Sequence, residues 1–323
     1  MRITNSMMLN SMMRNMGKNL NRMNKTEEML ATGKKFSLPS DDPIGVSRSL
    51  RLNTDVANME QYKRNTEDAL SWMGTTESAI DNIVTVFQRA RELTVQAANG
   101  TNSTDERNAI ANEMVQLKEQ IVGIANTSYA GSFIFSGFKT NQPLMDKDGN
   151  YLPADLSKNE VIEFNIGIAD RMAVNILPQK LFGVIGVATA DDPIDANAMI
   201  NSSTPPTPPT YKVPQMIKMF DDLIVGLKGG SLPAINNGLA RIDLQFNNIS
   251  AVRSEIGVKT NRLELTLNRI ESDTLNLTGL LSKNEDADIA EVIMNLKMQE
   301  SVYQASLSGG AKIIQPSLLD FLR

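Results

Sequence analysis

The chain has 323 residues, a net charge of −5, 41% hydrophobic residues and only 5% aromatic residues, so it can build a core mainly from aliphatic side chains and its 18 methionines. It contains neither cysteine nor histidine, which excludes disulfides, thiol nucleophiles, imidazole bases and zinc sites built on these residues. The negative charge argues against nucleic acid as the main partner, because the phosphate backbone requires a basic surface.

Residues 1–35 are predicted to form a Met- and Asn-rich amphipathic helix that stops at Gly33. Its apolar residues recur at alternating steps of four and three, the spacing of a helix that packs on another helix. This N-terminal stripe consists of Leu9, Met13, Met16, Leu20, Met23 and Leu30, with Glu27 as its polar interruption. The stripe could belong to an ordinary core, to a chaperone groove or to a membrane surface. Only the C-terminal stripe described below is available to cover it, which favours assembly partners or a chaperone.

Two further helices are predicted before residue 130. Asp42 followed by Pro43 is typical of a helix start, because the carboxylate accepts from free amides and proline fits the first turn. A long helix is expected from there to about Asn99. Ser103 and Glu106 then form a capping box for a third helix.

The character of the chain changes after Gly131, where alternating apolar and polar residues predict strands. The runs 162–168 and 172–176 indicate a hairpin that turns near Ala169–Asp170. Asp148-Gly149 is a turn signal. The surrounding residues superficially resemble a calcium loop, but they lack its glycine and glutamate at the required places, which favours the turn. The proline-rich residues 204–210 predict a stiff, extended linker or loop.

Helical spacing returns over 216–227 and stops at Gly229-Gly230, and a very long apolar pattern follows over 239–281. A helix of that length needs a partner of similar length, and only the predicted helix over 43–99 matches it. The last helix carries a C-terminal stripe, interrupted by Glu300. This stripe consists of Ile289, Ile293, Leu296, Tyr303, Leu307, Leu318 and Phe321.

Together these elements predict a mainly α fold with a β-rich insertion: a long antiparallel helical bundle built by the N- and C-terminal parts, with a small β domain in the middle. The expected segments are 1–42 (assembly helix and loop), 43–130 and 216–285 (bundle), 131–215 (β-rich domain with linker) and 286–323 (C-terminal assembly helix). No run approaches the ~18 apolar residues of a membrane span.

No residue set predicts catalysis, cofactor binding or metal binding. Asp41 and Asp42 could act as an acid–base pair, but a helix cap before proline explains them better. The most distinctive patterns lie at the two ends of the chain, where most proteins have frayed termini. The sequence therefore indicates assembly rather than chemistry.

Several motifs resemble the flagellin superfamily. Residues 30–35 followed by Pro39-Ser40-Asp41-Asp42-Pro43 are similar to its N-terminal signature, and Asp286-Ala287-Asp288 is similar to the start of its C-terminal helix. The segment 133–140, with Phe133, Phe135, Ser136 and Gly137, and the ending 317–322 are similar to the branch of the superfamily that joins hook and filament. The resemblance covers roughly residues 1–140 and 230–323.

The resemblance implies a structural, non-enzymatic protein without cofactors that adapts the flagellar hook to the flagellin filament. Its implied partners are further copies of itself in a ring, the first hook-associated protein, flagellin and a cytoplasmic export chaperone. Export through the flagellar type III apparatus would make it transiently cytoplasmic and finally extracellular, with terminal helices that order on assembly. The alternatives are a filament-forming flagellin and, from another class, a secreted effector or a membrane-active helical protein.

Overall fold

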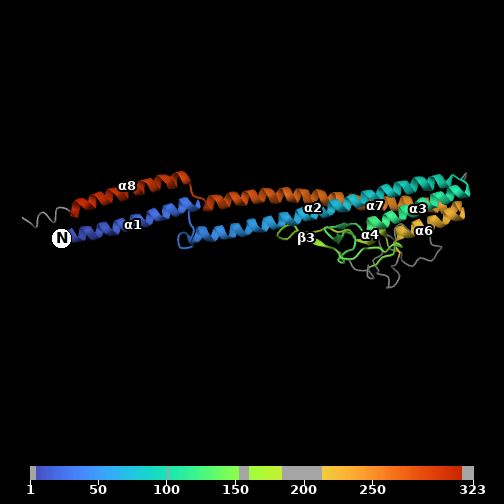
Figure 1. Cartoon of the computed structure of the whole chain (residues 1–323), viewed down its shortest axis with the longest axis horizontal. Coiled ribbons are helices and arrows are strands. Elements are labelled where there is room, and N and C mark those ends of the chain that lie inside the picture. The colour runs from blue at the N-terminus through green and yellow to red at the C-terminus, as the bar shows by residue number, and fades with distance from the viewer. Residues whose placement is uncertain (1–4, 100–101, 153–159, 184–212, 315–323) are drawn as a thin grey trace, which may run out of the picture. The chain divides into compact units, whose positions relative to one another are not determined.

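The computed structural model describes residues 5–99, 102–152, 160–183 and 213–314, and this part of the chain is mainly helical. The long helices are α1 (Asn5–Thr32), α2 (Pro43–Ala98), α3 (Thr104–Ala125), α6 (Gln215–Gly229), α7 (Leu232–Glu285) and α8 (Ile289–Ile314) (Figure 1). The chain forms two compact units. The first unit consists of Met1–Glu60 together with Ser272–Arg323, and the second unit consists of Gln61–Glu271. The helices α2 and α7 each contribute to both units, and the fold is the helical one that the sequence predicts.

Within the second unit, α2 and α7 run antiparallel. Three ion pairs join them: Lys63–Glu271, Asp81–Arg253 and Arg91–Asp243, at 2.7, 3.0 and 2.7 Å. Along this stretch of α7 every seventh residue is buried, namely Ile242, Ile249, Ile256, Leu263 and Ile270. A seven-residue period keeps one side of a helix turned to the core, and the ion pairs confirm the predicted pairing of the two long helices.

The helices α3 and α6 complete the second unit and pack on each other. The predicted capping box at α3 is present: the Ser103 hydroxyl accepts from the Glu106 amide at 3.3 Å, and the Ser103 amide donates to the Glu106 carboxylate at 2.7 Å. Lys118 of α3 forms an ion pair with Asp221 of α6 at 2.6 Å. The helix α6 ends at Gly230, whose φ of 67° is the left-handed conformation that glycine adopts freely.

The middle of the chain holds two small antiparallel sheets and the short helix α4 (Pro178–Phe182). Strands β1 (Ser128–Tyr129) and β2 (Ser132–Phe133) form one sheet, and β3 (Glu163–Asn165) and β4 (Arg171–Ala173) form the other. The second sheet is the predicted hairpin, with strands shorter than the alternating pattern suggested.

The hairpin also bonds to both long helices of the second unit. Arg262 of α7 contacts Asp170 at 2.8 Å, and Asn65 of α2 donates to the Asn165 carbonyl at 2.8 Å. The predicted turn at Asp148-Gly149 is also present, closed by a bridge between Met145 and Tyr151. The proline-rich segment 204–210 lies outside the described residues.

Six aromatic residues of the second unit meet in three edge-to-face pairs. These pairs are Trp72–Tyr129, Phe87–Phe220 and Phe135–Phe182, with ring centroids 6.0, 5.7 and 5.6 Å apart. In two of the pairs both rings are fully buried. Large rings therefore fix α2 against α6, and the 133–135 run against α4.

Candidate assembly surface

The helices α1 and α8 lie side by side in the first unit (Figure 1). They run antiparallel, since Met12 near the start of α1 meets Gly310 near the end of α8, whereas Thr26 meets Gln299. The end of α1 and the start of α8 lie where the sequence predicts them. Gly33, with φ of 70°, ends α1, and Asp288 caps α8 by accepting from the Ala290 amide at 3.0 Å.

The contact between α1 and α8 buries little apolar surface. In α8 the buried residues among those described are Val292, Leu296 and Gly310. In the described part of α1 the only buried residue is Thr26. Since helical order in water depends largely on burying an apolar face, this pair has a small apolar contact to offset its ordering entropy.

The predicted N-terminal stripe lies mostly outside this contact. Leu9, Met13, Leu20 and Leu30 leave 36–60% of their surface exposed, while Met16 and Met23 are half-buried. The buried and half-buried residues of α1 form the adjacent line, which is Met12, Met16, Asn19, Met23, Thr26 and Met29. Three of them, Met12, Asn19 and Thr26, contact α8. The helix therefore has a covered line and, beside it, an uncovered apolar line.

The C-terminal stripe is divided in the same way. Leu296 is buried and Tyr303 half-buried, whereas Ile289, Ile293 and Leu307 leave 43–46% of their surface exposed. Met294, Met298 and Val302 extend the exposed apolar surface of α8. The remaining members of the predicted stripe, Leu318 and Phe321, lie outside the described residues.

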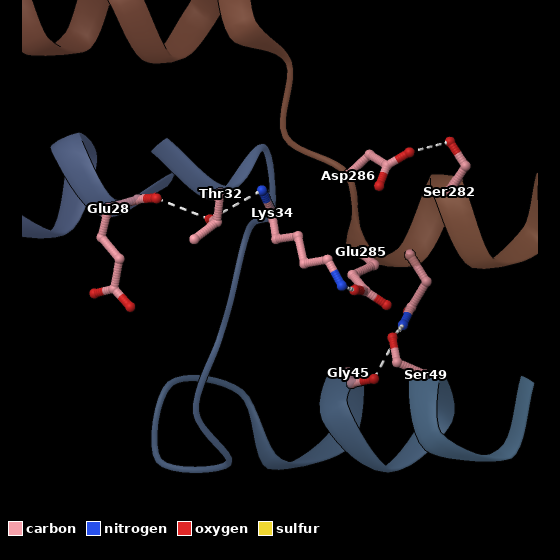
Figure 2. A network of polar contacts seen from close by, with 9 residues as sticks. Glu28, Thr32, Lys34, Gly45, Ser49, Ser282, Glu285 and Asp286 are labelled. Atoms are coloured by element: carbon pink, nitrogen blue, oxygen red, sulfur yellow. Dashed lines mark hydrogen bonds and ion pairs between the residues drawn. The ribbon is translucent and has the colours of Figure 1, made fainter. Parts of the chain in front are cut away.

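A polar joint connects this helix pair to the first turns of α2 and the last turns of α7 (Figure 2). The Lys34 ammonium forms an ion pair with the Glu285 carboxylate, and the Glu285 side chain is only 9% exposed. Two backbone hydrogen bonds flank the pair: the Lys35 amide donates to the Glu285 carbonyl at 2.7 Å, and the Ala287 amide donates to the Gly33 carbonyl at 2.8 Å. The chain leaving α1 is thus bound to the chain entering α8.

The start of α2 is bound to the same joint. The Asn284 side-chain amide donates to the Gly45 carbonyl at 2.9 Å and to the Ser49 hydroxyl at 2.8 Å, both of which Figure 2 labels. A side chain at Gly45 would collide with the Phe36 ring, 2.7 Å from its β-carbon. Glycine therefore permits the close approach of the loop to the helix.

The family-motif residues at the joint have separate structural roles. Asp42 caps α2 by accepting from the Ile44 and Gly45 amides at 3.1 and 3.0 Å, with Pro43 as the first helical residue. Lys25 donates to the Asp41 carboxylate at 2.8 Å, and this hydrogen bond lowers the pKa of Asp41 below its ordinary value. Ser40 is exposed beside them.

Asp286, another motif residue, accepts from the Ser282 hydroxyl at 2.5 Å (Figure 2). The motif residues of the segment 133–140 belong to the second unit. Phe135 is buried against Phe182, Phe133 lies in β2 and Ser136 is buried. Gly137 has a φ of 61°, next to the bond from the Phe138 amide to the Glu160 carboxylate.

The sequence did not point to Glu285, Asn284 or the polar residues between α1 and α8. Each looks like a solvated helix residue, because burial by a distant segment leaves no local signal. Lys34 lies within the family signature. Its ion-pair partner Glu285 is about 250 positions away in the sequence, so no local pattern connects the two residues.

The described residues offer no cluster of three or more acidic side chains suited to a metal ion. At the turn considered for calcium, the Asp146 carboxylate accepts from the amides of Asp148 and Asn150 at 3.0 and 2.7 Å, so its oxygen serves the turn itself. No helix in the described ranges is long and apolar enough to cross a membrane.

Two family models match the chain: the bacterial flagellin N-terminal helical region over residues 3–140 and the bacterial flagellin C-terminal helical region over residues 239–322. The chain is 29% identical over 322 residues to the flagellar hook-associated protein 3 of Escherichia coli (strain K12), covering 95% of both chains. It is 26% identical to a flagellin of Halalkalibacterium halodurans, covering 91% of this chain and 88% of the other. Its fold is similar to that of the flagellar junction protein FlgL from Legionella pneumophila, with a TM-score of 0.54, 18% identity, and coverage of 74% of this chain and 100% of that chain.

Proposed function

Because the chain belongs to the bacterial flagellin family, a structural family of the flagellum and not an enzymatic one, we propose that it is the adaptor subunit between flagellar hook and filament. The full-length similarity to a hook-associated protein supports the position at the junction. The family motifs at 39–43, 133–140 and 286–288 are consistent with it. The protein is a structural component located in the flagellum.

The observation that carries the assembly proposal is the apolar surface left uncovered on both terminal helices. Leu9, Met13 and Leu20 on α1, and Ile293 and Leu307 on α8, stay exposed although the two helices already cover each other. Exposed apolar lines of this extent mark surfaces that meet other proteins. Neighbouring copies of the subunit, packed through these lines, would bury them.

The terminal helices of the free subunit are proposed to be disordered until neighbours cover them. The small apolar contact between α1 and α8 supports this, because it is little compensation for ordering two helices of 28 and 26 residues. Disorder would let the chain pass unfolded through the type III export apparatus, with a cytoplasmic chaperone holding the termini. Protected backbone amides before Leu30 and after Ile289 in the purified monomer would contradict this part of the proposal.

In the assembled state the subunit would form a ring that contacts the first hook-associated protein on one side and flagellin on the other. Segments 1–42 and 286–323 would provide the assembly contacts, 43–130 and 216–285 the helical body, and 131–215 a separate middle domain. The final location would be extracellular, at the junction.

Labelling isolated flagella with gold-tagged antibody against this chain tests the proposal by electron microscopy. A narrow band where hook meets filament is expected. Absence of label from flagella in cells that express the protein would overturn the proposal. A matched strain without the gene should lose the label and should shed unattached filaments into the medium.

A filament-forming flagellin is the second candidate, because the similarity to the Halalkalibacterium flagellin also spans nearly the whole chain. That function would place gold label along the entire filament. Family membership gives no support to a secreted effector or a membrane-active protein.

A further inference from the structure

The line of contact between α1 and α8 contains polar residues where a simple helix pair would have apolar ones. Positions on both helices follow alternating steps of four and three. On α1 they are Met12, Met16, Asn19, Met23 and Thr26, and on α8 they are Val292, Leu296, Gln299, Tyr303, Ser306 and Gly310. The interrupting Glu27 and Glu300 of the predicted stripes are not part of this line.

The polar residues bond to one another across the contact. The Asn19 side-chain amide donates to the Gln299 backbone carbonyl at 3.1 Å. The hydroxyl of Thr26, which is 7% exposed, lies 3.1 Å from the Gln299 side-chain oxygen and 2.9 Å from the Arg22 carbonyl. One residue of α8, Gln299, therefore meets two residues of α1 that are two helical turns apart.

A polar residue inside a helix pair weakens the pair but restricts how the helices can slide. Apolar residues accept several neighbours of similar size, whereas a covered amide needs one partner at one position. A slip of one seven-residue period, which brings Met12 opposite Tyr303, would place Thr26 opposite Val292 and Gln299 opposite Asn19. Valine offers no hydrogen-bonding side-chain group, so Gln299 would lose its Thr26 contact.

We infer that Gln299, with Thr26 and Asn19, sets the register in which α1 pairs with α8. The close contact between Gly310 and the Met12 side chain marks the same register at the far end of the pair, because a β-carbon at Gly310 would meet the Met12 sulfur and methyl group. Fixing the register also fixes how the exposed apolar residues of α1 line up with those of α8. The inference concerns pairing within the chain, and it holds for a subunit at the junction or along the filament.

Disulfide formation in the full-length protein tests the register, since the chain has no cysteine of its own. One variant carries Met12→Cys with Gly310→Cys and reports the observed register. A second carries Met12→Cys with Tyr303→Cys and reports the slipped one. Both are oxidised mildly in purified full-length protein and on isolated flagella. Intramolecular bonds are then identified by peptide mass spectrometry.

In the parent background the 12–310 bond should form and the 12–303 bond should be minor. Adding Thr26→Val, which keeps the side-chain size, should raise the 12–303 share about tenfold, because the observed register then sets Gln299 against an apolar side chain, whereas the slipped register sets it against Asn19. The matched control Thr32→Val makes the same change at an exposed position of α1 and should leave the ratio as in the parent.

Equal bond ratios in the parent and Thr26→Val backgrounds would overturn the inference, because apolar fit alone would then set the register. A parent protein that forms no 12–310 bond in either preparation would overturn it as well. Neither result depends on where antibody labels the flagellum, so a failure here is distinct from a failure of the junction proposal.

Discussion

At the scale of single residues, the joint between the helices depends on a few polar side chains. Glu285 is nearly buried and has Lys34 as its ion-pair partner, while Asn284 bonds to the start of α2. A buried carboxylate is costly unless it is paired and hydrogen-bonded. An ion pair and side-chain hydrogen bonds therefore hold the loop after α1 and the start of α2 to the α7–α8 connection.

Removing the Lys34 charge should loosen this joint. Lys34→Met leaves the Glu285 carboxylate buried without its cation, and we expect a local loss of about 1 kcal/mol, because half of the Lys34 side chain remains in solvent. Hydrogen exchange at the Lys35 and Ala287 amides should then speed up about fivefold.

The control Lys297→Met removes an exposed ion pair with Glu300 on the same unit. It should not change exchange at the Lys35 and Ala287 amides. Unchanged exchange in Lys34→Met would show that the backbone hydrogen bonds hold the joint by themselves.

The contact between Lys25 and Asp41 should depend on pH in the acidic range. The hydrogen bond from Lys25 lowers the pKa of Asp41 below 3.8 in the folded chain. The contribution of the pair to stability is therefore complete above the unfolded pKa and is lost as the pH falls through the lower folded value.

An NMR titration of the Asp41 carboxyl carbon measures this directly. In the assembled parent protein, where α1 is ordered, the midpoint should lie below 3.8, and Lys25→Met should return it towards that value. A parent midpoint at or above 3.8 would contradict the contact.

At the scale of elements, packing in the second unit is set by period and by a few large side chains. The seven-residue spacing from Ile242 to Ile270 keeps α7 against its neighbours over its length. Phe87 of α2 and Phe220 of α6 meet edge to face, which fixes these two helices relative to each other. The helices of the second unit therefore share one hydrophobic core, although the strands between them are short.

Phe220→Ala should destabilise this core strongly. The ring is fully buried, so its removal leaves a cavity and should cost about 3–5 kcal/mol in the free energy of unfolding. Phe138→Ala is the matched control, because that ring is 61% exposed and its loss should cost well under 1 kcal/mol. Urea denaturation followed by far-UV circular dichroism compares the two, and equal midpoints would contradict the packing described for Phe220.

At the scale of the whole molecule, the subunit carries apolar surface that folding of one chain leaves uncovered. Both terminal helices contribute to it, and the family to which the chain belongs builds the flagellum. An assembly subunit benefits from this division. Its second unit has a core of its own, and we propose that its termini become ordered only when neighbours cover them.

Charges placed on the exposed apolar lines should block assembly without unfolding the second unit. Leu20→Glu on α1 and Ile293→Glu on α8 put a carboxylate where a neighbouring subunit would bury an apolar side chain, and we expect soft-agar swimming to fall to the level of a gene deletion. Asn21→Glu and Gln304→Glu add the same charge at exposed polar positions of the same helices, and they should swim like the parent.

The unfolding curve of the second unit should be the same in all four variants. Normal swimming and gold label in Leu20→Glu and Ile293→Glu would show that these lines are not buried on assembly.

The sequence alone predicted most of the helical architecture. The four–three spacing identified α1, α2, α7 and α8, Gly33 marked the end of α1, and Ser103 with Glu106 marked the start of α3. These signals are local, because periodicity and capping depend on residues within a few turns of one another. The same locality explains why the hairpin at 162–176 was found but its length was overestimated.

Only the tertiary structure decided which side of each terminal helix is covered. The stripe through Leu9, Met13 and Leu20 has the more apolar residues, yet the contact with α8 uses the neighbouring line with Asn19 and Thr26. It also decided that Glu285 is buried against Lys34. Burial depends on which distant segments arrive at a position, and the hydrogen bonds across α1 and α8 join residues more than 270 positions apart. A periodic pattern shows that a helix has an apolar side, whereas the partner that covers it is set by the three-dimensional fold.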